Sequence, residues 1–333
     1  ATSLEARNIK IKITEIPIPV AFAAAFEGER IRKGDMFAEF GGNKTEAWEL
    51  VIHKEAAEVE DHKIEIIGPN IDEVEPVNGL VRLPLAVIVK IAGKQMQDDF
   101  EPVLERRFHY FMNYIEGVMH VGQRDMSWVR ISKDAYEKGF RLEHIGEVLY
   151  AKMRDEFETV VDKCEITIIT DPEQVSARKS EATSRYDARD ERLASLVDES
   201  VDTFYSCNLC QSFAPAHVCV VTPERLGLCG AVSWLDAKAT KELDPTGPCQ
   251  PIVKGECLDD RTGVWNSVNE TVSQISQGAV ESVTLYSILE DPMTSCGCFE
   301  CICGIMPEAN GFVIVNRERS EERRVGKECR SRW

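Results

Sequence analysis

The sequence predicts a mixed α+β protein of two domains, each built on a mixed sheet, with the second built around a cysteine-ligated metal cluster. Three observations lead to this fold class. The first half combines short apolar runs that fit strands with longer segments of helical periodicity. A charged stretch then separates this half from the rest. Beyond it, ten of the twelve cysteines fall between Cys207 and Cys303.

The first domain, residues 1–178, contains several strand candidates. Apolar residues alternate with polar ones in "IKIKIT", from Ile9, and in "HKIEIIG", from His62, so each segment predicts a strand with one buried face. The run "LPLAVIVKIAG", from Leu83, is continuously apolar and is typical of a strand buried on both faces.

Helices are expected to pack on these strands. Residues 98–122 carry apolar side chains at three- and four-residue steps, which predicts one helix, and residues 144–161 predict a second. The segment "CEITIIT", from Cys164, predicts a returning strand. Several strands followed by helices indicate a mixed sheet rather than a regular series of βαβ units. We therefore expect residues 1–178 to form an α+β domain, the middle domain of a longer protein.

The second half is organised around the cysteines. Residues 179–200 are charged and predict a linker or a linker helix. Residues 201–318 form the expected metal-binding domain, with a helix in "NSVNETVSQISQ" and strands in "ESVTLYSI" and "GFVIVN". The basic residues 319–333 do not resemble what precedes them and are expected to be a non-native tail. The chain lacks an initiator Met, so we expect a native N-terminal portion to be missing.

Composition limits the class of protein. The net charge of −18 would repel phosphate backbones, so nucleic acid is not an expected partner. No apolar stretch is long enough to span a bilayer, and the start has no signal-peptide core, so we expect a cytoplasmic protein without a membrane partner. Cysteines that cluster locally in a large chain of a reducing compartment favour metal ligation over disulfides.

The first cluster, "CNLCQSFAPAHVCVVTPERLGLCG", has four cysteines separated by two, eight and nine residues. Structural zinc sites usually pair two short Cys-x-x-Cys spacings, whereas only the first pair is close here. The wider spacing favours a [4Fe-4S] cubane, with zinc and unligated core thiols as the alternatives. His217 lies within this cluster and is either a ligand or, more commonly for such a residue, a hydrogen-bond partner of nearby backbone.

The second cluster contains the sequence Cys296-Gly297-Cys298. Two thiolates and the two backbone amide nitrogens between them can bind one ion in an S₂N₂ plane, a geometry that Ni(II) and Cu(II) prefer. Gly297 has no Cβ to obstruct the fold of the backbone around the ion. The alternative is that both cysteines are further thiols of an iron–sulfur cluster. Cys301-Ile302-Cys303 has the same spacing, so spacing does not choose between the pairs.

Together, the first cluster and the segment "EDPMTSCGCFECICGIMPEANGFVIVNRE" closely resemble the acetyl-CoA synthase subunit of the carbon monoxide dehydrogenase/acetyl-CoA synthase complex. The resemblance includes "EIPIPVAF" and "AFEGERIR" near the start and runs from about Ile9 to Glu318. Bacterial members of the family carry an N-terminal domain that docks to carbon monoxide dehydrogenase, and the family chain continues beyond "NRE". The resemblance therefore implies a fragment that lacks both parts.

The resemblance implies an active centre in which a [4Fe-4S] cubane is joined to two nickel ions. The cubane ligands carried over by motif position are Cys207, Cys210, Cys219 and Cys229. The proximal nickel would be bridged by Cys210, Cys296 and Cys298, and the distal nickel would take sulfur from Cys296 and Cys298 with the backbone nitrogens of Gly297 and Cys298. Other cysteines, including Cys249 and Cys257, receive no ligand role.

The implied activity is that of an acyltransferase, a CO-methylating acetyl-CoA synthase. A methyl group would arrive from a corrinoid iron–sulfur protein, CO would arrive from the carbon monoxide dehydrogenase subunit, and CoA would accept the acetyl group. Phe213 could form a roof over the proximal nickel, or could pack in the core. Trp128 and Arg130 are of the types that stack on adenine and pair with phosphates, which makes them candidate CoA contacts of the first domain, although most such residues are structural.

Two other functions remain compatible with the residues alone. An iron–sulfur protein of electron transfer would need the cubane but no nickel, and the Cys-Gly-Cys sequence would then have no purpose. A zinc-stabilised interaction module would need neither. The metal content of the purified chain distinguishes the three functions: iron with nickel, iron alone, or zinc alone.

Overall fold

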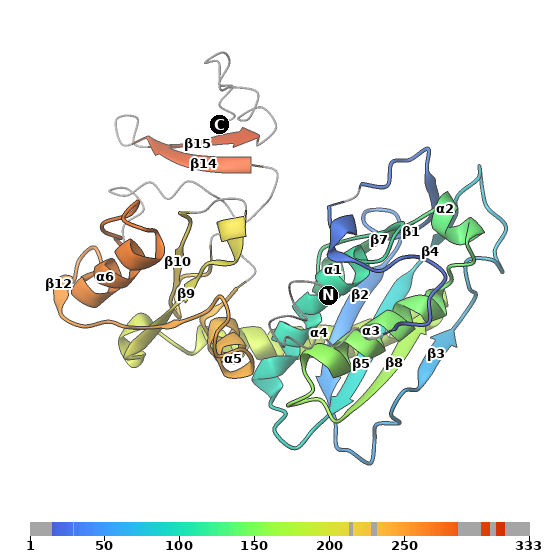
Figure 1. Cartoon of the computed structure of the whole chain (residues 1–333), viewed down its shortest axis with the longest axis horizontal. Coiled ribbons are helices and arrows are strands. Elements are labelled where there is room, and N and C mark those ends of the chain that lie inside the picture. The colour runs from blue at the N-terminus through green and yellow to red at the C-terminus, as the bar shows by residue number, and fades with distance from the viewer. Residues whose placement is uncertain are drawn as a thin grey trace, which may run out of the picture. The chain divides into compact units, whose positions relative to one another are not determined.

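The computed structural model describes the backbone and side chains of most of the chain, and the backbone of two further strands: residues 15–28, 30–212, 216–227, 232–285, 301–306 and 311–316. The chain divides into two compact units, unit 1 (Ala1–Asp187) and unit 2 (Ala188–Trp333). Each unit combines helices with β-sheet (Figure 1), so the mixed α/β class predicted from the sequence is confirmed. Parallel and antiparallel strand pairs occur together in both sheets of unit 1. The strand pairs described in unit 2 are all antiparallel, so the mixed sheet predicted for the second domain is not found among its described strands.

Unit 1 contains two four-stranded sheets, in the orders β4-β1-β7-β6 and β2-β5-β8-β3. The strands of the first sheet are β1 (Met36–Gly41), β4 (Val81–Leu83), β6 (Val118–Val121) and β7 (Trp128–Ser132). Those of the second are β2 (Ala47–His53), β3 (Ile64–Ile67), β5 (Leu85–Ala92) and β8 (Lys163–Ile169). The helices are η2 (Ala24–Phe26), η3 (Asp98–Phe100), α1 (Glu101–Asn113), η4 (Arg124–Met126), α2 (Lys133–Glu137) and α3 (Leu142–Glu156).

The second sheet is covered on both faces, which explains its apolar strands. Helix α1 contacts β2, and helix α3 contacts β8 and β3 (Figure 1). The opposite face packs on the start of a long helix, α4 (Pro172–Ala194), through Val175, Ala182 and Tyr186. The buried indole of Trp48 donates a hydrogen bond to the carbonyl oxygen of Val175 at 3.0 Å, which fixes α4 against β2.

Helix α4 covers most of the segment that the sequence indicates as a charged linker or linker helix. Pro172 occupies its first turn, where a missing N–H costs nothing. The carboxylate of Asp171 accepts a hydrogen bond from the Gln174 amide at 2.9 Å and so caps the start. The few apolar residues of the segment follow the helical repeat, so a largely polar sequence still forms a helix with one buried face.

One predicted helix is shorter than expected. Residues 98–122 were predicted as a single helix, but α1 ends at Asn113 and Val118–Val121 forms strand β6. Gly117 makes the turn between them at φ +75°, and a Cβ there would lie 2.4 Å from the Ser132 hydroxyl oxygen. Val118 and Met119 satisfy a helical repeat by spacing, yet they are buried as strand residues.

Other predicted elements are confirmed in type. Strands form at β3 and β8, and the helix expected over 144–161 is α3. The apolar run from Leu83 is interrupted at Pro84, where β4 ends and β5 begins, because proline cannot donate a ladder hydrogen bond. The strand predicted from Ile9 lies outside the described residues.

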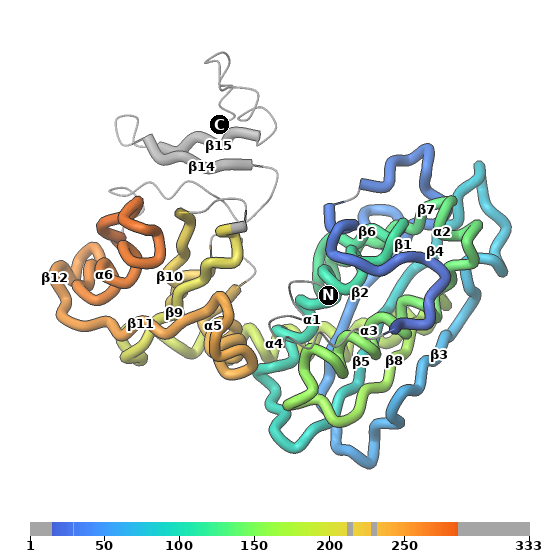
Figure 2. Tube along the Cα trace, viewed as in Figure 1, coloured from blue at the N-terminus to red at the C-terminus, as the bar shows by residue number. Residues whose placement is uncertain are grey.

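Unit 2 is built on the sheet β10-β9-β11 (Figure 2). The other sheets described in this unit are two-stranded. The three-stranded sheet contains β9 (Thr203–Cys207), β10 (Cys219–Val221) and β11 (Pro251–Val253). The other strands are β12 (Cys257–Asp259), β13 (Val264–Trp265), β14 (Cys301–Met306) and β15 (Gly311–Asn316). The helices are η5 (Asp198–Ser200), η6 (Leu209–Ser212), α5 (Trp234–Leu243) and α6 (Asn266–Ile275).

Strand β9 has a hydrophobic cluster on each face. Phe204 lies on one face, in a cluster with Val268 and Val272 of α6. Cys207 lies on the other, in a cluster with Ala237 of α5. Alternate residues of one strand therefore enter two separate clusters, as the period of two requires.

The predictions for the C-terminal part of unit 2 have mixed outcomes. The helix in "NSVNETVSQISQ" is α6, and the strand in "GFVIVN" is β15. The strand predicted for "ESVTLYSI" is wrong over its described residues, 281–285, which pair with no strand. Val283 and Leu285 are nevertheless both buried. The alternating apolar pattern therefore predicted the buried side chains correctly, but these residues do not form a strand.

A buried polar cluster connects the second sheet to α1 and β6. Glu49 and His120 are fully buried, and His120 Nε2 lies 2.5 Å from Glu49 Oε1. The Ser127 hydroxyl donates to the same oxygen, whereas Glu49 Oε2 has no hydrogen-bond partner among the described residues. His109 Nδ1 lies 3.4 Å from His120 Nδ1, and Asn113 exchanges hydrogen bonds with the backbone of His120.

Buried glutamates also protect the outer edge of the second sheet. Strand β2 is at the end of the strand order, so its edge N–H groups need partners from outside the sheet. Glu101 Oε1 accepts from the His53 amide at 2.7 Å, and Glu105 Oε2 accepts from the Val51 amide at 3.0 Å. Helix α1 therefore covers this edge with two carboxylates from successive turns.

This edge contact predicts the effect of substitutions at Glu101. In Glu101→Leu the His53 N–H loses its acceptor inside the protein, and we expect the free energy of unfolding to fall by about 1–3 kcal/mol. Glu101→Gln keeps an acceptor oxygen and should lose less. Urea unfolding measures both changes. Equal stability of the Leu and Gln variants would show that the hydrogen bond does not stabilise the edge.

The histidines of the buried cluster predict a pH dependence of stability. Burial, together with the charge of His120, lowers the pKa of His109 from 6.5 to about 4. Between these values the unfolded chain binds more protons at this residue than the folded chain, so the free energy of unfolding falls as the pH is lowered from 6.5 towards 4. Urea unfolding should therefore show a smaller loss over this range in His109→Gln than in the parent. The exposed His62→Gln is the control, and a parental pH profile in His109→Gln would contradict this contribution.

Candidate metal centre

Two of the predicted metal-ligating cysteines face each other across adjacent strands. Cys207 ends β9, Cys219 begins β10, and the two are direct partners in this antiparallel pair. Both strands consist of residues that favour a sheet, with the sequences "TFYSC" and "CVV". Cys210 lies in η6, the first turn of the connection between the strands. The structure therefore brings three of the four predicted cubane ligands into one hairpin.

Cys249, to which the family resemblance assigns no ligand role, lies on the other side of Cys207. The Ser206 amide donates to the Gln250 carbonyl at 2.8 Å, and the Asn208 amide donates to the Pro248 carbonyl at 3.3 Å. These bonds flank Cys207 and Cys249, which are therefore opposite each other as a non-hydrogen-bonded pair, the type in which side chains approach most closely. The short strand "PIV" after Cys249 was the only sequence signal for this position.

The three opposed cysteines are buried together. Cys207 and Cys219 are each 6% exposed and Cys249 is 1% exposed, in a cluster that includes Val221 and Ala237. Cys210 is half-buried. All four are thiols rather than disulfides. Their side chains offer soft sulfur donors in an apolar setting, which suits iron–sulfur clusters and other thiophilic metals more than Mg²⁺ or Ca²⁺.

His217 lies beside one of these sulfurs. Its Nε2 is 3.2 Å from Cys219 Sγ, and partial burial lowers the pKa of the imidazole. The sequence left two alternatives, a metal ligand or a hydrogen-bond partner of nearby backbone, and the ligand alternative stays a prediction. The imidazole approaches the sulfur of a predicted ligand.

The remaining predicted site residues lie outside the described part of the chain: Cys229, Phe213, Cys296, Gly297 and Cys298. Within the described residues, no three His, Cys, Asp or Glu side chains converge on the position of a single ion. The thiols of Cys249, Cys207 and Cys219 instead follow one another across three adjacent strands. Neighbouring strands are about 4.8 Å apart, so the outer two strands are separated by roughly twice that distance.

Trp128 and Arg130, the candidate CoA contacts, both bind a buried carboxylate. Glu39 Oε1 accepts from Trp128 Nε1 and from Arg130 Nε, each at 3.2 Å, and Arg82 Nε donates to Glu39 Oε2 at 3.0 Å. Burial raises the pKa of Glu39, but these hydrogen bonds outweigh burial and hold the pKa below 4.5. The Arg130 guanidinium also lies 4.2 Å from the centre of the Trp128 ring and donates to the Ile31 carbonyl.

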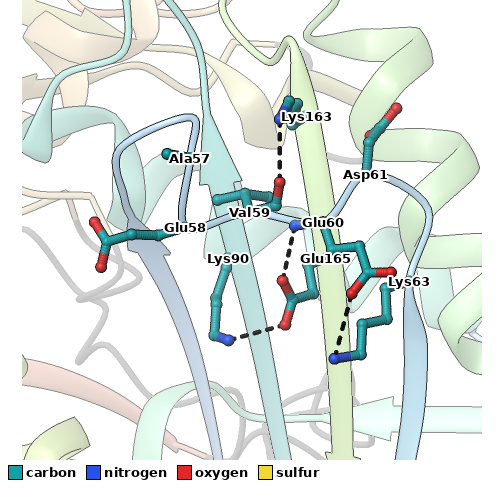
Figure 3. A pocket seen from close by; sticks show the side chains of 9 residues that line it. All are labelled: Ala57, Glu58, Val59, Glu60, Asp61, Lys63, Lys90, Lys163 and Glu165. Carbon is teal, nitrogen blue, oxygen red and sulfur yellow. Dashed lines mark hydrogen bonds and ion pairs between the residues drawn. The ribbon is translucent and has the colours of Figure 1, made fainter.

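A pocket of about 600 Å³ lies elsewhere in unit 1, and none of the predicted site residues lines it (Figure 3). Its lysines are engaged by the protein itself. Lys90 pairs with Glu165 at 2.8 Å, and Lys163 donates to the Ala56 and Val59 carbonyls. No predicted site residue lines this pocket, so we assign it no part in the site.

Fold and donor set define a mixed α/β protein with a sulfur-rich site. Two family models match the chain. The model described as the CO dehydrogenase/acetyl-CoA synthase complex beta subunit matches residues 18–175, and the model for the C-terminal part of the ACS/CODH beta subunit matches residues 186–330. The chain belongs to this family of acetyl-CoA synthase/decarbonylase subunits.

Similar curated proteins have corresponding names. Carbon monoxide dehydrogenase/acetyl-CoA synthase subunit alpha of Moorella thermoacetica is 52% identical over 318 residues, which cover 96% of this chain and 43% of that protein. Acetyl-CoA decarbonylase/synthase complex subunit beta 1 of Methanocaldococcus jannaschii is 48% identical over 95% of this chain and 41% of its own length. The beta subunit of Methanopyrus kandleri is 50% identical over 93% of this chain and 66% of its own. The chain thus spans about two fifths of the first two relatives.

The helices give no indication of a membrane span. None of those in the described ranges combines the length and the apolar character needed to cross a bilayer.

The register of the thiols predicts which disulfide forms first in the metal-free chain. A disulfide needs Cβ atoms about 3.5–4.5 Å apart, which a non-hydrogen-bonded pair approaches more closely than a hydrogen-bonded one. We therefore expect mild oxidation with diamide to link Cys207 to Cys249 in preference to Cys219, with the linked peptides identified by mass spectrometry. Cys249→Ala is the control. A dominant link between Cys207 and Cys219 would contradict the assigned pairing.

Proposed function

We propose that the chain is the part of an acetyl-CoA synthase/decarbonylase subunit that binds the metal centre at which CO, a methyl group and CoA are combined into acetyl-CoA. The observation that carries the proposal is the pairing of Cys207 with Cys219 across β9 and β10, with Cys210 in the turn that follows. Family membership supports acetyl-CoA synthesis in general. The activity is that of an acyltransferase.

The residues fit an iron–sulfur and nickel centre by donor chemistry, since the described candidates are thiols in an apolar cluster. A [4Fe-4S] cluster would be held by Cys207, Cys210, Cys219 and Cys229. A proximal nickel would be held by Cys210, Cys296 and Cys298, and a distal nickel by Cys296, Gly297 and Cys298. When bound, this group would supply a low-valent metal site for uniting the methyl group with CO and for acyl transfer to the CoA thiol.

The chain itself contributes position and exclusion of water. Cys207 and Cys219 lie on adjacent paired strands, so the backbone that carries their sulfurs is in place before any metal binds. Their burial keeps water away from the ligand sulfurs, which strengthens local electrostatic interactions. Phe213, which lies in the same connection of the sequence as Cys210, would limit access to the proximal nickel.

CoA binding at Trp128 and Arg130 belongs to the same proposal. Because Glu39 and the Ile31 carbonyl already bind the Arg130 guanidinium, its proposed contribution is chiefly to hold the Trp128 ring. The ring would then offer an aromatic surface to the adenine of CoA. A phosphate contact by Arg130 would require it to share its N–H groups with Glu39.

The proposed partners follow from the reaction. Relatives are named as subunits of complexes that contain carbon monoxide dehydrogenase, and that enzyme is the proposed source of CO for this chain. A corrinoid iron–sulfur protein is the proposed source of the methyl group.

Iron content tests the proposal. After anaerobic reconstitution, the parent should contain iron and nickel and show the broad visible absorption of an iron–sulfur cluster. Cys219→Ala should lose that absorption and most of the iron, because it removes one of four ligands. The matched control is Cys249→Ala. It removes a buried thiol from the same hydrophobic cluster as Cys219, but this thiol is not a proposed metal ligand.

Other outcomes identify the alternatives. Iron without nickel in the parent would favour an electron-transfer protein, and zinc alone would favour an interaction module. Equal iron in the parent and in a folded Cys219→Ala would overturn the ligand assignment.

A further inference from the structure

The four predicted cysteine ligands do not account for the contact between His217 and Cys219. His217 lies two residues before β10, on the connection that carries the site, and its Nε2 is 3.2 Å from Cys219 Sγ. This separation falls within the range of a hydrogen bond to sulfur. Cys219 is buried and its backbone is held by the register with Cys207, whereas His217 is half-buried.

The direction of this hydrogen bond depends on what the sulfur binds. A thiol can donate its proton to an imidazole nitrogen, but a sulfur bound to a metal is a thiolate and can only accept. When Cys219 is a ligand, His217 must therefore carry its hydrogen on Nε2 and donate it to the sulfur. The hydrogen bond then affects the iron–sulfur cluster as well as the protein.

We propose that His217 is a positioning residue that donates Nε2–H to the Cys219 ligand sulfur and raises the reduction potential of the iron–sulfur cluster. The inference rests on the proposed function, because it requires Cys219 to ligate a cluster. Hydrogen bonds to ligand sulfurs are among the factors that set the potential of such clusters. The donor withdraws negative charge from the sulfur and so stabilises the reduced form, which is one electron more negative.

The redox step that it affects is a simple one-electron reduction. An external reductant, such as dithionite acting through mediators, gives one electron to the oxidised [4Fe-4S]²⁺ cluster and yields [4Fe-4S]⁺. No bond to the protein forms or breaks, and the proton of His217 stays on Nε2 in both states. The hydrogen bond shifts the equilibrium because it is stronger to the more negative sulfur.

The first test is a redox titration of the reconstituted full chain, followed by electron paramagnetic resonance. His217→Phe removes the donor and should make the midpoint potential more negative, with unchanged iron content. His217→Gln keeps a neutral N–H near the Nε2 position and should restore part of the difference. His62→Phe, a substitution of an exposed histidine in unit 1, should leave the potential unchanged. A parental potential in His217→Phe would overturn the inference.

A second test detects the hydrogen bond directly in the parent chain and uses the variants only to assign the signal. With ¹⁵N incorporated only into histidine, electron–nuclear double resonance of the reduced cluster should show a weak nitrogen coupling, as expected through a hydrogen bond. The coupling should persist in His62→Phe and vanish in His217→Phe. A strong coupling, of the size that a directly bound nitrogen gives, would mean that His217 is a ligand, and no coupling would mean that the contact is absent. Either result overturns the inference.

The two proposals fail in different ways. A parent chain that takes up no iron–sulfur cluster would overturn the proposed function and, with it, this inference. A parent that binds the cluster, loses it in Cys219→Ala and yet has the same potential with Phe at position 217 would overturn the inference alone.

Discussion

The pairing of β9 with a strand on each side is the constraint on which the site depends. Because side chains alternate along a strand, a slip of one residue would exchange Cys207 with Ser206 and would carry Phe204 out of the cluster that it shares with α6. The register is fixed by more than backbone bonds. The Gln250 amide donates to the Ser206 hydroxyl oxygen at 3.2 Å, and the Trp234 indole donates to the Thr203 carbonyl at 2.9 Å. Each of these contacts would be lost in the slipped arrangement.

Unit 1 depends on a different principle, the pairing of buried carboxylates. The chain has an excess of acidic residues, and several of them are inside the protein, where an unpaired charge is costly. Glu39 is compensated by two arginines and an indole, and Glu49 by His120 and Ser127. These groups come from strands and loops that are distant in sequence, so each carboxylate joins several elements and fixes the surroundings of Trp128.

The sequence was informative where a local signal reports a local structure. Alternation identified β3 and helical periodicity identified α3. Of the cysteines singled out by their spacing, Cys207 and Cys219 are register partners in the β9–β10 hairpin. It failed where two structures share one pattern, as at Val118, whose spacing suits both a helix face and strand β6.

The register between segments that are distant in sequence cannot be predicted from local sequence patterns. The position of Cys249 opposite Cys207 follows only from the pairing of β11 with β9, and the compensation of Glu49 by His120 follows only from the packing of β6 near β2. The contact of His217 with Cys219 is local in sequence, but it depends on a side-chain orientation that spacing does not encode.

The strand order of the second sheet has a consequence for synthesis of the chain. Strand β3 pairs only with β8, which follows it by about a hundred residues, and β8 also fills the open side of β5. As the chain leaves the ribosome, the apolar edge of β5 therefore stays without its partner until Ile169 has emerged, although β2 is already available. Such an edge invites pairing with other nascent chains. Helix α1, which contacts β2, emerges in that interval and can cover part of the incomplete sheet before β8 arrives.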